Sequence, residues 1–125
     1  MTEADVITHW RKGAKESLQL ATHAQKDKSF ALALFHCHLA VEKALKAQYM
    51  EEHRKEPLPT HNLVLLAHEL ARPWTEEEIR KLDFLTQYAV AARYDDPFWA
   101  EREATEENGA HWIDVADVFL SSLLP

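Results

Sequence analysis

The chain has 125 residues, 46% hydrophobic and 28% charged, which is the balance of one globular domain able to bury a core without disulfides or a structural metal. Its 2 glycines and 5 prolines are too few for an all-β sandwich, and its single cysteine excludes an internal disulfide framework and fits a reducing cytoplasm. The formal net charge of −7 is uneven, because residues 1–74 carry 10 basic and 9 acidic side chains whereas residues 75–107 carry 4 and 10. This pattern excludes an extended nucleic-acid groove but leaves room for a local basic cleft in the first half.

Two long helices are predicted in the first half of the chain. Apolar residues recur at three- and four-residue steps over residues 2–27, where Thr2 or Asp5 can cap the start and Gly13 marks a close approach of another helix. The second helix is expected over residues 29–54. Its first half is apolar on nearly every face, which indicates the central buried helix.

Three more helices are predicted in the second half. Thr60 is expected to cap a short helix that ends at Arg72. The capping box Thr75–Glu78 begins a helix that runs to about Ala92, and a last helix begins near Thr105. Short connections between these elements favour antiparallel neighbours.

The sequence therefore predicts an all-α fold, an up-and-down antiparallel bundle of about five helices in a single domain over residues 1–125. The longest nearly apolar run is too short to span a membrane, and the N-terminus carries acids where a signal peptide would carry bases. We expect a cytoplasmic protein with no membrane partner.

Charged residues lie where the second helix becomes amphipathic. Glu42 and Lys46 are four residues apart, the spacing at which opposite charges meet on a helix. One interpretation is a solvated stripe of charge. The other is that Lys43 and Lys46 line a cleft for a phosphate group.

The 8 histidines do not show the spacing of a metal site, and no cofactor motif is present, so neither a metal nor a cofactor is expected. His61 follows a proline-containing loop at a predicted helix start. It is either an ordinary surface histidine or a residue beside backbone N–H groups where an anion can dock. Cys37 lies in the most apolar run and is expected to be a small core residue.

The segment 93–99 (RYDDPFW) has no clean period and is the strongest candidate site. Arg93 offers a fork of donors for a phosphate or carboxylate, and Asp95 or Asp96 can orient it. The aromatic residues can stack on a base or seal an interface between chains. The alternative is a helix-end ion pair with aromatics in the core.

Four blocks of this sequence resemble the HEPN (higher eukaryotes and prokaryotes nucleotide-binding) domains. The blocks are WRK at 10–12 with Ala14 and Leu18, FALALFH at 30–36 leading into AVEKALKA at 40–47, PTHNL at 59–63 with Leu66, and ARY at 92–94 with Asp96. The resemblance implies a helical bundle like the C-terminal domain of aminoglycoside nucleotidyltransferases and a homodimer with a cleft at its interface. It also implies a minimal nucleotidyltransferase as partner in a toxin–antitoxin-like pair.

Many HEPN proteins are metal-independent ribonucleases whose signature is Arg, four to six residues, then His. Counted from Arg93, the allowed positions hold Phe98, Trp99 and Ala100, so the signature is missing. The resemblance therefore favours a non-catalytic protein that binds a nucleotide or RNA phosphate, or that docks on a nucleotidyltransferase. The candidate ligand-binding residues are Arg93, Asp96, Tyr94, Lys43, Lys46, His61 and Glu42.

In this hypothesis Arg93 clamps the phosphate, Asp96 orients Arg93, and Tyr94 stacks or donates a hydrogen bond. Two alternatives stay open. The protein can be a divergent endoribonuclease that uses Arg93 with His61 or His38, or a structural dimerisation module in which Arg93 only pairs with a neighbouring aspartate.

Overall fold

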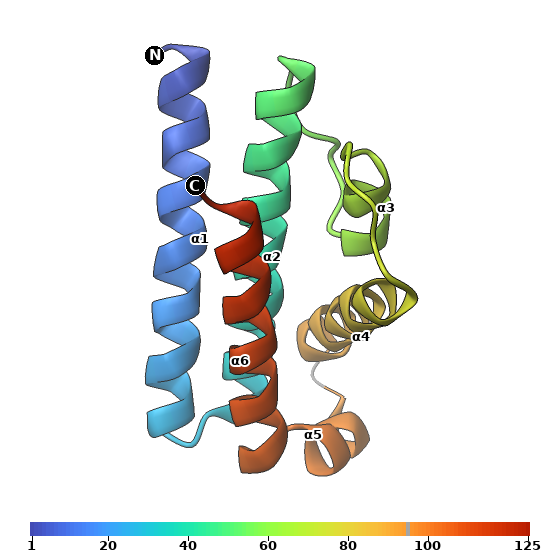
Figure 1. The fold of residues 1–125 in the computed structure, drawn as a ribbon. Helices are drawn as coiled ribbons and strands as arrows, with labels where there is room; N and C mark the ends of the chain where they lie inside the picture. The colour runs from blue at the N-terminus through green and yellow to red at the C-terminus, as the bar shows by residue number, and fades with distance from the viewer. Residues whose placement is uncertain (95) are drawn as a thin grey trace.

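The computed structural model describes residues 1–94 and 96–125, and this part of the chain forms six helices and no strand. They are α1 (Glu3–Lys26), α2 (Phe30–His53), α3 (Leu63–His68), α4 (Glu76–Arg93), α5 (Pro97–Glu103) and α6 (Glu106–Leu123). The predicted all-α bundle is confirmed. In Figure 1, α1 runs antiparallel to α2 and α6, and α4 crosses the bundle at a steep angle. Across the described ranges, every helix is too short or too polar to span a bilayer.

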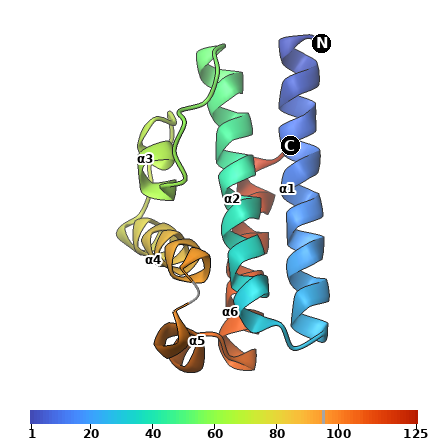
Figure 2. The ribbon, with the colours of Figure 1, turned by 180° about the vertical axis from the view of Figure 1, so that it is seen from behind.

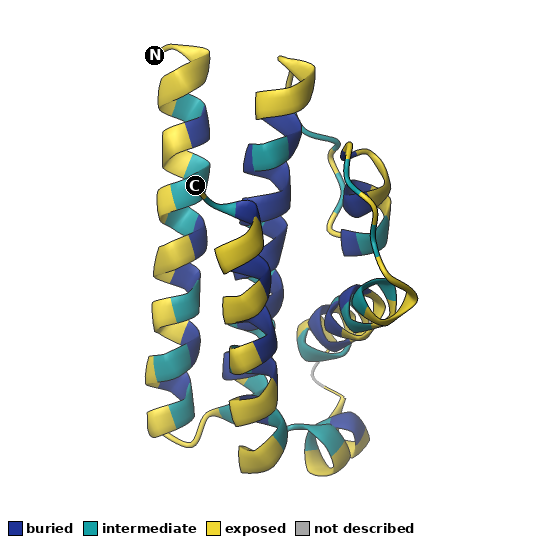
Figure 3. Ribbon diagram, in the orientation of Figure 1, coloured by how far each residue is buried: buried dark blue, intermediate teal, exposed yellow. Residues whose placement is uncertain are grey.

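The central helix is α2, as its apolar first half predicts. It contacts α1 and α6 on one side and α3 and α4 on the other (Figures 1 and 2). Leu34, Val41 and Leu45 are fully buried, and Figure 3 shows buried residues on most of its length. Cys37 is buried too, and burial raises the pKa of its thiol to about 12, so it is a core residue as expected.

Local capping signals determine where two helices begin. The Thr2 hydroxyl accepts a hydrogen bond from the Asp5 N–H at 3.1 Å, and the Asp5 carboxylate accepts one from the Thr2 N–H at 3.0 Å. Thr75 and Glu78 form the same reciprocal box at 3.1 and 3.0 Å. Each box satisfies two donors that would otherwise lack a partner, so these starts follow from sequence alone.

The start of α3 differs from the prediction. Asn62, not Thr60, is the N-cap: its side-chain oxygen accepts from the Val64 and Leu65 N–H groups at 3.0 and 3.2 Å. The Thr60 hydroxyl instead accepts from the Asn62 N–H at 3.1 Å and tightens the turn before the helix. The helix also ends at His68 rather than Arg72, and residues 69–72 form a turn and bends ahead of Pro73.

The short helix α5 is absent from the sequence prediction. Asp96 caps it by accepting from the Phe98 and Trp99 N–H groups at 2.9 and 3.3 Å, and Pro97 occupies its first position. Aspartate followed by proline is a helix-start signal. Seven residues give too few turns for an apolar period to show it.

Aromatic side chains join α4, α5 and α6. Tyr88 of α4 lies 5.8 Å from the Trp99 ring and 5.5 Å from the Trp112 ring, and both indoles are buried. Trp99 therefore lies in the core, and Phe98 beside it is 76% exposed. This cluster attaches the segment after Arg93 to the rest of the bundle.

The core of α2 makes a first testable prediction. Leu45→Ala removes a fully buried side chain and should lower the free energy of unfolding by about 2–5 kcal/mol. The matched control is Leu32→Ala in the same helix, because Leu32 is half exposed and its truncation should change stability by only about 0.5 kcal/mol. Urea denaturation followed by circular dichroism measures both. Equal losses would contradict the placement of α2.

Candidate functional site

A buried carboxylate lies at the centre of the candidate site. Glu42 of α2 is only 3% exposed. Its Oε2 accepts a hydrogen bond from the Lys46 ammonium at 3.1 Å, and its Oε1 accepts one from His61 Nδ1 at 2.9 Å. A buried charge is strongly unfavourable unless it is paired, so these two partners are what permit Glu42 to lie here.

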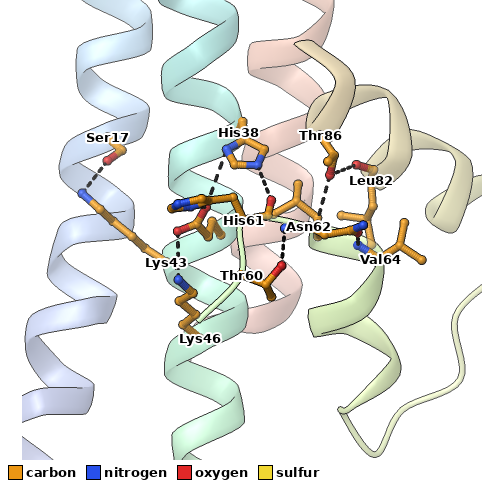
Figure 4. Close-up of polar contacts among 12 residues, drawn as sticks. Ser17, His38, Lys43, Lys46, Thr60, His61, Asn62, Val64, Leu82 and Thr86 are labelled. Carbon is orange, nitrogen blue, oxygen red and sulfur yellow. Dashed lines mark hydrogen bonds and ion pairs between the residues drawn. The ribbon is translucent and has the colours of Figure 1, made fainter. Parts of the chain in front are cut away.

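The loop that carries His61 is fixed from two directions. His38 of α2 donates through Nε2 to the His61 carbonyl at 2.8 Å, and the Leu63 N–H donates to the Thr86 hydroxyl of α4 at 3.1 Å (Figure 4). With Nε2 as its donor, neutral His38 has no hydrogen on Nδ1, which lies 3.8 Å from Glu42 Oε1. His61 thus lies over α2 through both its backbone and its side chain.

The His61 side chain combines a buried anchor with an exposed surface. Nδ1 points to the Glu42 carboxylate, yet 63% of the side chain is exposed. Because Nδ1 carries the donated hydrogen, Nε2 is the ring nitrogen that a ligand can reach. A carboxylate that holds Nδ1 fixes both the tautomer and the orientation of an imidazole.

Electrostatics connects Arg93 to this cluster. Burial is the largest cause that lowers the pKa of His38; the bond to the His61 carbonyl and the charge of Glu42 act in the opposite direction. The charges of His61 and Arg93 lower the pKa of His38 further. Arg93, the last residue of α4 and exposed, is therefore close enough to act on the same histidine.

The other candidates occupy different positions. Lys43 points to α1, where its ammonium donates to the Ser17 hydroxyl at 3.0 Å (Figure 4). A Cβ on Gly13 would lie 3.2 Å from Lys43 Cδ, which confirms a close approach at that glycine. Lys43 thus faces away from His61. The structure does not bring the ammonium groups of Lys43 and Lys46 into one phosphate cleft, because Lys43 binds Ser17 and Lys46 binds Glu42.

Two residues that follow Arg93 lie at helix ends. Tyr94 is 77% exposed at the end of α4, and Asp96 caps α5. Within the described residues no ion pair joins Arg93 to Asp96, and Asp95, the other proposed orienter, lies outside those residues. The structure thus places Lys46 and His61 in direct contact with Glu42 and leaves Tyr94 and Asp96 between α4 and α5.

His38 is a member of this cluster that the sequence did not place among the candidate ligand-binding residues. His38, Glu42 and Lys46 follow one another at four-residue steps and so share one face of α2. That spacing was readable from sequence. The charged stripe interpretation is wrong for Glu42 and Lys46, because both side chains are buried. Across residues 1–94 and 96–125, no three His, Cys, Asp or Glu side chains are arranged to hold a metal ion.

The lowered pKa of His38 predicts the pH dependence of stability. The unfolded chain, with a histidine pKa near 6.5, binds a proton more tightly than the folded chain does. The stabilisation from neutral His38 is therefore complete above the unfolded pKa and is lost as pH falls through the folded pKa. His38→Gln keeps an N–H donor without titrating, so it should lose less stability than the parent between about pH 7.5 and about pH 5.5.

Urea denaturation at both pH values measures this difference. The control is His68→Gln, because His68 is exposed on α3 and its replacement should leave the pH dependence unchanged. If His38→Gln loses as much stability on acidification as the parent does, groups other than His38 cause the pH dependence.

The comparisons with known proteins agree with this architecture. A sequence profile of the HEPN domain matches residues 7–124. None of the curated proteins is similar enough to count as a match. The crystal structure of TT1696 from Thermus thermophilus is similar with a TM-score of 0.82 and 23% identity, and the alignment covers 94% of each chain. At that identity the likeness shows a shared fold, whereas the profile covers nearly the whole sequence. The chain belongs to the HEPN domain family.

Proposed function

We propose that this HEPN protein binds the phosphate of a nucleotide or of RNA at the surface shared by His61 and Arg93, without cleaving it. The observation that carries the proposal is the His61 imidazole, anchored by a buried carboxylate at 2.9 Å and yet 63% exposed. An ordered polar group at a surface is suited to recognition, because little side-chain entropy remains to be lost on binding.

Charge around His61 supports an anionic ligand. The negative charge of Glu42 is balanced by Lys46 through their 3.1 Å contact. Arg93 adds a positive charge near His38, whose Nε2 donates to the His61 carbonyl. Its guanidinium can donate two parallel hydrogen bonds to a phosphate, and protonated His61 can donate from Nε2.

The missing ribonuclease histidine supports binding rather than cleavage. Of the three positions where the signature would place it, Trp99 is buried against Tyr88, Ala100 is half-buried and Phe98 is exposed. None of the three side chains can transfer a proton at neutral pH. Arg93 therefore keeps a phosphate-binding role without the acid–base partner expected in an active relative.

Binding should depend on Arg93. Arg93→Ala removes charge-assisted hydrogen bonds worth about 1.5–3 kcal/mol and should weaken nucleoside monophosphate binding by roughly 10- to 100-fold. Isothermal titration calorimetry measures the dissociation constant. The matched control is Arg80→Ala, an exposed arginine earlier in α4 that should bind like the parent. Equal affinity in parent and Arg93→Ala would overturn the proposal.

A metal-independent endoribonuclease is the second candidate, and one observation favours it. Glu42 and His61 form the carboxylate–imidazole pair that orients a general base in many hydrolases. In such a reaction His61 Nε2 takes the proton of the RNA 2′-OH, the 2′-oxygen attacks phosphorus, and the 5′-oxygen leaves with a proton from water. Arg93 would stabilise the phosphorane charge.

Single-stranded RNA separates the two candidates. If the protein is an enzyme, it should cleave RNA, and His61→Gln should slow cleavage by about 10²- to 10⁴-fold whereas His68→Gln should not. Denaturing gel electrophoresis of an end-labelled oligonucleotide measures the rate. If the RNA stays uncleaved in the presence of excess protein, the endoribonuclease hypothesis is wrong and the phosphate-binding hypothesis remains.

The homodimer, the nucleotidyltransferase partner and the toxin–antitoxin role that the resemblance implies stay predictions. Apolar side chains exposed next to Arg93 support a contact with another chain at that end of α4. They are Val90, Tyr94 and Phe98, which are 50%, 77% and 76% exposed. Such a contact would place the interface between the two chains beside the proposed phosphate site.

A further inference from the structure

A hollow of about 260 Å³ adjoins the Lys46 end of the candidate site. Its walls are Val6 and Trp10 of α1, Lys46 and Met50 of α2, and residues 56–59 of the loop that follows α2. We call it the Trp10 hollow. Its volume lies just below the range of about 300–1,000 Å³ for pockets that hold drug-sized ligands, so it has room for one ring system.

The chemistry of the Trp10 hollow suits a flat aromatic ring. The Trp10 indole is half-buried and offers a surface for stacking, and the other walls are mostly apolar. The Lys46 ammonium lies 5.5 Å from the centre of the Trp10 ring and supplies one charged donor. Nucleobases combine these needs, because every base has a π face and carries hydrogen-bond acceptors at its edge.

The Trp10 hollow and the phosphate site share parts. Lys46 lines the hollow and also donates to Glu42, whose other oxygen holds His61. On the loop side, Pro59 lines the hollow and stands two residues before His61, so their Cα atoms are at most about 7 Å apart. One mononucleotide is long enough to reach from this wall of the Trp10 hollow to His61.

We propose that the Trp10 hollow is a base-binding subsite, which takes the nucleobase of the nucleotide whose phosphate lies near His61 and Arg93. This inference rests on the proposed function. Trp10 stacks on the base, Lys46 donates to an acceptor on its edge, and the loop 56–59 closes the opposite side.

Two ligands separate the base from the phosphate. Ribose 5-phosphate carries only the sugar and phosphate, whereas AMP, GMP, CMP and UMP add a base. The parent protein should bind at least one nucleotide more tightly than ribose 5-phosphate. In Trp10→Leu, which keeps apolar bulk without an aromatic face, this nucleotide should bind roughly 5- to 100-fold more weakly, and ribose 5-phosphate should bind as before.

The conservative variant Trp10→Phe keeps a stacking ring and should retain most of the nucleotide affinity. Calorimetry measures all dissociation constants, and thermal denaturation checks that each variant folds. Should Trp10→Leu fail to fold, an NMR titration of the parent protein replaces that variant. A nucleotide should shift the Trp10 indole N–H resonance, and ribose 5-phosphate should not.

The outcomes distinguish this subsite from the proposed function. If ribose 5-phosphate and the nucleotides bind equally and binding depends on Arg93, the base subsite is wrong and the phosphate site remains. If neither binds, both proposals are wrong. If nucleotides bind more tightly but Trp10→Leu matches Trp10→Phe, the base lies elsewhere and the Trp10 hollow is not its subsite.

Discussion

The rest of the site depends on the ion pair and hydrogen bond made by one buried carboxylate. Removing a charge from water is unfavourable by several kcal/mol, and Glu42 meets that penalty with Lys46 and His61. The same contacts give the connection after α2 a defined position. Without them, this connection would be held to the bundle by the His38 bond to the His61 carbonyl and by the Leu63 bond to Thr86. A polar cluster inside an apolar helix layer therefore aligns a loop that carries the accessible imidazole.

The starts of the helices could be predicted from sequence where the capping residues and their partners lie close together in the chain. The boxes at Thr2 and Thr75 lie within three residues of their partners, so the sequence shows them directly. The start of α3 was harder, because Thr60 and Asn62 are both good capping residues and only the geometry of the turn decides between them. For α5 the aspartate–proline signal was present, but a helix of two turns has no apolar period to support it.

For the candidate site, the sequence indicates one of the two contacts of Glu42 and gives no sign of the other. Glu42 and Lys46 belong together by their spacing, whereas the Glu42–His61 contact joins residues nineteen positions apart. Sequence periodicity carries no information about such a pair. Lys43 shows the converse: it lies between two site residues in sequence, yet Gly13 leaves room for its stem and Ser17 accepts its ammonium, so α1 draws it to the opposite side.

The short helix α5 also limits how the ribonuclease pattern can arise in this scaffold. A histidine in place of Trp99 would empty part of the aromatic cluster around Tyr88, and large-to-small changes there destabilise a core. Phe98 is not constrained in this way, since three-quarters of it faces solvent. Trp99 therefore belongs to the core, whereas its neighbour Phe98 faces solvent. Replacing Phe98 with histidine would create the arginine–histidine spacing of the ribonuclease signature without emptying the aromatic cluster around Tyr88.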